Sequence, residues 1–143
     1  KGQRTAFGLG TLLTAVYDEA SDSFKSIAKV GSGLTEQAIV EYEQMLKKIK
    51  VAAKPKNVES GLEPDIWVEP KYVAEVTADE ITKSPLHVAG KNGEQGYALR
   101  FPRILKLRTD KRPEESTTVE EIIKMFKLQK HVQHEAGEEI VEG

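Results

Sequence analysis

The sequence contains no cysteine and only three histidines. The lack of cysteine excludes a disulfide scaffold, a cysteine-ligated zinc site and a thiol nucleophile. Two of the histidines, His131 and His134, stand three residues apart in a polar C-terminal stretch. There a solvated surface is a simpler interpretation than a metal site. We therefore assign no metal ligand to this chain.

Long apolar segments and familiar catalytic signatures are also missing. No stretch approaches membrane-spanning length, and none resembles a signal peptide. The sequence has neither a glycine-rich phosphate loop of the P-loop type nor a Ser/His/Asp arrangement. Neighbouring acids such as Asp79 and Glu80 point in different directions and are typical of solvated surface. Taken by itself, the chain lacks a full catalytic set.

What is present fits one soluble globular domain with an uneven distribution of charge. The chain has 143 residues, a formal net charge of -2, 38% hydrophobic residues and 31% charged residues. Cations gather between Ala98 and Arg112, whereas acids dominate after Arg112. The chain starts with Lys1 rather than Met, and we expect it to be an excerpt of a longer protein. We expect residues 1–131 to form the domain and residues 132–143 a polar acidic tail.

Hydrophobic periodicity predicts five short strands. They are Thr11–Tyr17, Phe24–Val30, Ile66–Val68, Tyr72–Thr77 and Ala98–Leu107. The first two form a hairpin, and Pro102 requires an edge position or a bulge in the last. Between the fourth and fifth strands, Ser84–Gly96 is expected to be a long polar loop.

Two helices are predicted beside these strands. Thr35 is a suitable N-cap for a helix whose apolar residues recur at intervals of three and four up to Ile49. A C-terminal helix has Val119, Ile122, Ile123 and Phe126 on its apolar face. Its capping box is either Thr118 with Glu121 or Thr117 with Glu120. The order of elements predicts a mainly β protein, a five-stranded antiparallel OB-fold barrel with an inserted helix and a C-terminal helix; ubiquitin-like and SH3-like arrangements stay open.

The most informative segment is the basic strand Ala98–Leu107 with the residues that follow it. It brings together six cations, namely Arg100, Arg103, Lys106, Arg108, Lys111 and Arg112. Apolar residues alternate with these cations, which suits a strand with one face in a core. Because guanidinium groups bind phosphate oxygens bidentately, phosphate is the anion we expect there. A solvated basic strand is the alternative.

The order of residues in this segment resembles motif VI of the ATP-dependent DNA ligases. The resemblance lies in Leu99–Arg103 and Arg108–Lys111, with a spacing of four residues between them. Three flanking segments also resemble that family in the right order: Gly31–Gln37, Trp67–Pro85 and Pro113–Thr118. The resemblance runs from Lys1 to about His131, and archaeal-type or eukaryotic-type ligases are the most similar.

The resemblance implies that the chain is the C-terminal OB-fold domain of an enzyme that seals nicks in duplex DNA. In this family an upstream adenylation domain carries the lysine nucleophile in a K-x-D-G motif, which this sequence lacks. That domain would also bind most of the ATP and Mg²⁺. We expect the isolated domain to be monomeric, inactive and intracellular, the last in a prokaryotic cytoplasm or a eukaryotic nucleus. Replication, repair and recombination are the processes in which such enzymes act.

The family's motif VI cations engage the ATP phosphates during enzyme adenylylation. The resemblance implies this role for Arg103, Arg108 and Lys111. It implies that Asp110 orients a neighbouring cation or contacts the nucleotide site. Lys106 occupies a variable position, and we assign no role to it. These four residues, Arg103, Arg108, Asp110 and Lys111, form the predicted catalytic set.

A second group is expected to contact DNA. Arg100 and Phe101 correspond to residues at the minor groove beside the nick, although burial in the core is an alternative for Phe101. Arg4 and Lys29 are expected phosphate contacts. Gln3 replaces a basic residue common in the family, which weakens the case for a phosphate clamp at Lys1–Arg4.

Two other functions are compatible with the pattern. A non-enzymatic OB-fold nucleic-acid-binding module is one, although the aromatic content of 6% is low for stacking single-stranded bases. An RNA ligase or guanylyltransferase barrel is the other. It shares the R-x-D-K pattern but not the L-R-F-P-R lead-in.

Overall fold

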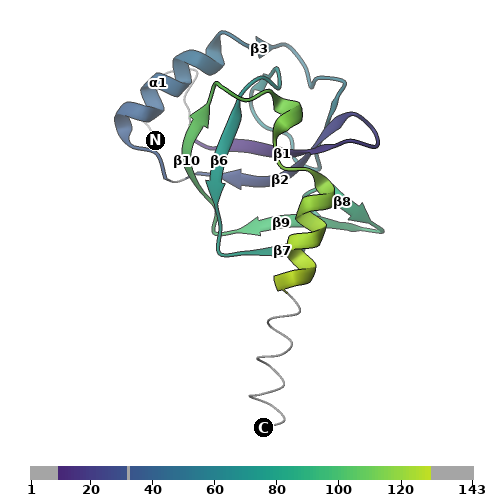
Figure 1. Cartoon of the computed structure of the whole chain (residues 1–143). Coiled ribbons are helices and arrows are strands. Elements are labelled where there is room, and N and C mark those ends of the chain that lie inside the picture. Colours follow the sequence, from purple (N-terminus) through teal and green to yellow (C-terminus); the bar gives the residue numbers. More distant parts are fainter. Residues whose placement is uncertain (1–9, 32, 130–143) are drawn as a thin grey trace.

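The computed structural model describes residues 10–31 and 33–129, and strands dominate it (Figure 1). The strands are β1 (Leu12–Asp18), β2 (Ser23–Val30), β3 (Lys50–Val51), β4 (Val58–Glu59), β5 (Trp67–Val68), β6 (Val73–Thr77), β7 (Glu80–Ser84), β8 (Ala89–Asn92), β9 (Gln95–Arg100) and β10 (Arg103–Arg108). Helix α1 (Glu36–Lys47) lies between β2 and β3. A short 3₁₀ turn, η1 (Pro113–Glu115), precedes a C-terminal helix of residues 119–129.

The strands form four small sheets. Their orders are β1-β2-β4, β10-β6, β3-β5 and β7-β9-β8, and all pairs are antiparallel except β2 with β4. Within the described residues, the backbone ladders do not close into one ring. A mainly β body with one helix after the second strand and another at the C-terminal end agrees with the predicted OB-fold class. The strands are shorter and more numerous than periodicity indicated.

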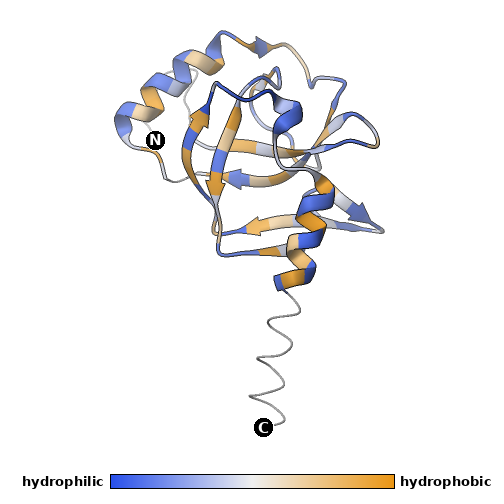
Figure 2. Ribbon diagram, in the orientation of Figure 1, coloured by the Kyte–Doolittle hydropathy of each residue, from blue (hydrophilic) through white to orange (hydrophobic). Residues whose placement is uncertain are grey.

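One continuous core joins the sheets to the C-terminal helix. Its buried residues are Val16, Ile27, Ala28, Val30, Ile81, Ala89, Ile104, Val119 and Ile122. Both helices alternate between hydrophilic and hydrophobic residues along the ribbon (Figure 2), as expected for helices that cover a core with one face. A smaller cluster around Leu46 and Ile49 fixes the end of α1. No helix in the described residues has the length and apolarity to span a membrane.

Local capping signals were predicted correctly at both helices. The Thr35 hydroxyl accepts a hydrogen bond from the Ala38 amide at 3.1 Å. At the C-terminal helix, the Glu121 amide donates to the Thr118 hydroxyl at 3.1 Å, and the Thr118 amide donates to the Glu121 carboxylate at 2.9 Å. This reciprocal pair is the capping box. The alternative box of Thr117 with Glu120 is therefore wrong.

The prediction of a polar loop at Ser84–Gly96 is wrong. Its first residue, Ser84, ends β7, residues Ala89–Asn92 form β8, and Gln95 and Gly96 begin β9. Strands β8 and β9 form a tight hairpin in which Gly93 has a φ of 78°, a value that glycine adopts without strain. Ala89 is fully buried and anchors β8 in the core. The three glycines, the source of the loop prediction, belong to this hairpin and to its close backbone contacts.

The prediction of one continuous strand at Ala98–Leu107 is also wrong. The chain breaks at Phe101 and Pro102, and the two halves, β9 and β10, belong to different sheets. Phe101 has a φ of 53°, which turns the chain, and Pro102 has no amide proton for a ladder. The sequence indicated an edge or bulge at Pro102, and the structure has a corner there.

Replacing Thr118 by alanine is expected to lower the free energy of unfolding by about 1 kcal/mol, because the Glu121 amide loses its acceptor. Thr117→Ala is the matched control. The Thr117 carbonyl accepts a hydrogen bond from the Tyr17 amide at 3.0 Å, and this backbone contact does not depend on the side chain. That control should change stability by less than about 0.5 kcal/mol. Urea denaturation measures both, and equal losses would contradict the assignment of the cap.

Candidate functional site

A β-bulge in β10 decides which of its residues face outward. Arg103 and Ile104 pair with Thr77 and Val76, but the register then shifts, so that Lys106 pairs with Glu75. Leu105 is the extra residue. In a regular strand, residues five positions apart point to opposite faces. The inserted residue reverses that phase, so Arg103 and Arg108 share the outer face.

The burial pattern of β10 agrees with this change of phase. Ile104 is 1% exposed and Leu107 is half-buried, so these two residues form the inner face. Arg103, Leu105 and Lys106 are exposed, and Arg108 is half-buried, so its outward direction follows from the register with Val73. The inner residues are therefore three positions apart rather than two or four. The strand consequently presents cations from both of its ends on one side.

The glycine-rich segment before α1 packs directly on this strand. Gly33 has a φ of 107°. A Cβ atom there would lie 2.4 Å from the Ile104 carbonyl oxygen and 2.7 Å from the Ile104 nitrogen. Only glycine permits this approach. Two sequence segments that carry the resemblance, Gly31–Gln37 and motif VI, are thus in contact just before the bulge.

At the end of β10, Arg108 and Asp110 form a bidentate pair. The Nε and Nη2 atoms of Arg108 donate to the two carboxylate oxygens of Asp110 at 2.9 and 2.7 Å. The hydrogen bonds from Arg108 are the main cause that lowers the pKa of Asp110 to about 2. Asp110 is therefore ionised across the whole physiological range of pH, and it orients the guanidinium plane of Arg108. Lys111 follows immediately and is exposed.

At the other end, the corner between β9 and β10 presents Arg100 and Phe101. Arg100 Nη1 donates to Glu80 Oε2 at 2.8 Å, and its guanidinium carbon lies 5.0 Å from the centroid of the Phe101 ring. Phe101 is 60% exposed, so the alternative of core burial is wrong. A bulky residue with a positive φ is strained. The fold thus holds an aromatic ring in solvent at a conformational cost.

The pair of Arg108 and Asp110 and the pair of Arg100 and Phe101 lie at opposite ends of β10, whose length of six residues corresponds to roughly 17 Å at ~3.3 Å per residue. Arg103 begins β10 and stands beside the Phe101 corner. Lys29 is exposed on β2, opposite Leu13. Arg4 lies outside the described residues. Sequence reasoning missed Glu80, because its contact with Arg100 depends on the pairing of β7 with β9.

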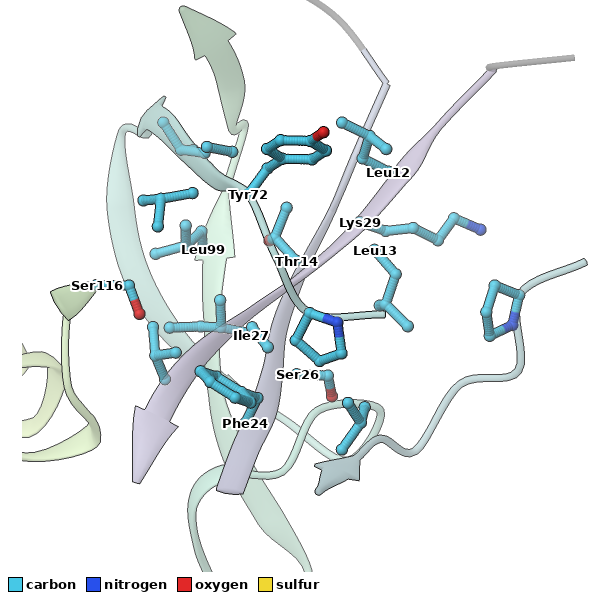
Figure 3. A pocket seen from close by; sticks show the side chains of 18 of the residues that line it. Leu12, Leu13, Thr14, Phe24, Ser26, Ile27, Lys29, Tyr72, Leu99 and Ser116 are labelled. Atoms are coloured by element: carbon cyan, nitrogen blue, oxygen red, sulfur yellow. The ribbon is translucent and has the colours of Figure 1, made fainter. Parts of the chain in front are cut away.

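A large cavity in the described part of the chain lies elsewhere. It has a volume of about 1010 Å³ between the β1–β2 hairpin and the segment that leads into β6. Figure 3 shows Thr14, Ile27, Tyr72 and Leu99 among its walls. None of the predicted nucleotide-binding cations, Arg103, Arg108 and Lys111, lines it. These three cations therefore lie outside the cavity, whereas Lys29, a predicted DNA contact, lines it. In the described residues, no group of three or more His, Asp or Glu side chains is arranged to hold a metal.

Comparison with known proteins gives one consistent result. The family described as "ATP dependent DNA ligase C terminal region" matches residues 5–111, which include all of β10 and end at Lys111. A probable DNA ligase of Dictyoglomus turgidum is 52% identical over 132 residues, which cover 91% of this chain and 23% of that protein. A DNA ligase of Caldivirga maquilingensis is 47% identical over 127 residues, covering 86% of this chain and 21% of that protein. The chain thus spans less than a quarter of the length of these relatives.

A solved structure is also similar. It is that of mycobacterial DNA ligase D complexed with ATP and MES. The TM-score is 0.54 at 26% sequence identity, and the match covers 80% of this chain and 34% of the other. The similarity therefore extends from the sequence motifs to the arrangement of the strands.

The strain at Phe101 leads to a stability prediction. Phe101→Asn should leave the free energy of unfolding unchanged or raise it by up to about 1 kcal/mol, because asparagine tolerates a positive φ and the ring is exposed. Phe126→Asn is the control, since that ring is half-buried against Tyr97 and the core. It should cost about 2 kcal/mol or more. If urea denaturation gave equal losses for the two variants, Phe101 would be a packing residue.

Proposed function

Because the chain belongs to the family of ATP-dependent DNA ligase C-terminal regions, we propose that it is the OB-fold domain of an enzyme that seals nicks in duplex DNA. The observation that carries the proposal is the bulged strand β10, which places Arg103 and Arg108 on one outer face. The parent enzyme would adenylylate itself, transfer AMP to the 5′-phosphate of a nick, and form the phosphodiester bond.

In the first step, the domain supplies positive charge to the ATP phosphates. Attack by a lysine on the α-phosphorus requires the pyrophosphate leaving group to be held in line and its charge to be offset. Arg103, Arg108 and Lys111 would do this, and Asp110 would keep the guanidinium of Arg108 oriented. The nucleophilic lysine belongs to an upstream adenylation domain. Mg²⁺ would assist the phosphoryl steps from ligands mainly in that domain.

In the later steps, the domain binds the nicked duplex with its other end. Arg100 and the exposed ring of Phe101 would lie at the minor groove beside the nick, where an apolar ring tolerates a widened groove. Lys29 and Arg4 would contact backbone phosphates. Arg108 and Lys111 lie at the opposite end of β10 from Phe101, so the two ends would act in alternation, with the domain turned differently for each step; Arg103 stands at the Phe101 end.

The family membership favours this function over the two alternatives. A non-enzymatic binding module would not need the bidentate pair of Arg108 and Asp110 at the strand end. An RNA ligase or guanylyltransferase barrel would not need the exposed Phe101 before the bulge. An intracellular location and a monomeric isolated domain follow from the same proposal.

In the full-length enzyme, Arg108→Ala or Lys111→Ala should lower the rate of adenylylation about 10²-fold, the usual loss when one donor to a developing charge is removed. Sealing of pre-adenylylated nicks should change only a few-fold, because ATP plays no part in that step. Radiolabelled ATP measures the first step and a gel assay the second. Lys124→Ala, on the outer side of the C-terminal helix, is the control. Equal losses in both steps would make these cations general DNA contacts.

The isolated chain should bind nicked duplex in preference to single-stranded DNA of the same length, with an affinity that falls steeply as salt rises. It should form no covalent adenylate with radiolabelled ATP. Fluorescence anisotropy across a salt series and a denaturing gel check the two statements. A stable adenylate would contradict the proposal that the nucleophilic lysine belongs to the upstream adenylation domain.

A further inference from the structure

We propose that the lysine-rich segment 47–56 is a second DNA-binding surface, which contacts the phosphate backbone of the duplex away from the nick. The proposal rests on the proposed function and extends it. Its five lysines are Lys47, Lys48, Lys50, Lys54 and Lys56, and all are exposed. No acidic residue occurs from position 44 to position 58, in a chain whose net charge is -2.

The backbone of this segment is held in place at both ends. Ile49 is buried, and its carbonyl accepts from the Glu69 amide at 2.9 Å. Lys50 pairs with Val68 in the β3–β5 ladder. At the far end, the Phe24 amide donates to the Asn57 carbonyl at 2.7 Å. The lysines are thus displayed on an ordered backbone, so binding an anion immobilises less of the chain than it would in a tail.

The positive charge of the segment is largely uncompensated. The salt bridges within the described residues involve Lys25, Arg100, Arg108 and Arg112 as cations, and none of the five lysines. Lys54 donates to the Val58 carbonyl at 2.7 Å. Glu69, next to the β3–β5 pair, is one acid that the strand pairing brings close.

A purely structural role explains only part of this pattern. Lys47 and Lys48 stand at the C-terminal end of α1, where cations stabilise the helix dipole. Lys50, Lys54 and Lys56 lie beyond the helix and outside the reach of that effect. Figure 2 shows the end of α1 and the start of β3 as hydrophilic.

The size and position of the surface suit a long polyanion. Positions 50–56 span at most roughly 20 Å at ~3.3 Å per residue, and the bends at positions 52 and 53 and the turn at 56 and 57 shorten that span. A duplex carries about one charge per 1.7 Å of its axis, so several phosphates fall within reach of the lysines. In Figure 1, the end of α1 and β3 lie at the upper end of the molecule, whereas the corner between β9 and β10 lies lower. A duplex gripped at Phe101 would have to extend along the domain to reach the lysines.

The test compares two triple variants of the chain with the same change of net charge. The first is Lys48→Gln, Lys50→Gln and Lys56→Gln. The control is Lys91→Gln, Lys124→Gln and Lys127→Gln, at exposed positions on β8 and the C-terminal helix. Anisotropy measures binding to a 30-base-pair duplex, nicked or intact, across a salt series. The first variant should lose at least tenfold in affinity at low salt, and its salt slope should fall by about 2 to 3, close to 0.9 per phosphate contact.

The loss should be equal for nicked and intact duplex, because backbone contacts do not distinguish them. The control should stay within threefold of the unaltered chain. Equal losses in both triple variants, or no loss in the first, would overturn the inference and leave the proposed function standing. An unaltered chain without affinity for nicked duplex would overturn both. The single variants Lys50→Gln and Lys56→Gln, each expected to lower the slope by about 1, decide the matter if the triple variant unfolds.

Discussion

The burial of Ile104 is the constraint on which the functional surface depends. This side chain is 1% exposed, and its backbone meets Gly33 so closely that no Cβ atom fits between them. With Ile104 fixed inward, the bulge at Leu105 and the inward turn of Leu107 leave Arg103 and Arg108 outward. The cations that we assign to ATP therefore take their direction from an apolar contact.

Two ion pairs then fix the orientation of arginine side chains that core packing has positioned. Arg100 is held by Glu80, and Arg108 by Asp110. Exposed ion pairs add little to stability, so their value lies in orientation. A guanidinium with a fixed plane loses less rotational freedom when it binds a phosphate or a groove edge. Both carboxylates thus orient a guanidinium group, one at each end of β10.

The distribution of charge gives the domain three basic regions on a nearly neutral chain. They are the corner at Arg100, the strand end at Arg108, and the lysine-rich segment 47–56. Under the proposed function, the strand end would meet the nucleotide and the other two regions the duplex, in different orientations of the domain. A single basic cluster of the same total charge would make those two ligands compete for one place.

Local signals in the sequence were enough to determine the hairpin β1–β2, both helices and the cap at Thr35, since alternation and capping act over a few residues. The order of motifs was enough to assign the family. The sequence left open which threonine caps the last helix and whether Phe101 is buried. It gave no sign of β8, of the bulge at Leu105 or of the partner of Arg100. Those features were decided by tertiary structure, because each depends on which strand lies opposite and on what space the core leaves, neither of which is encoded within one segment.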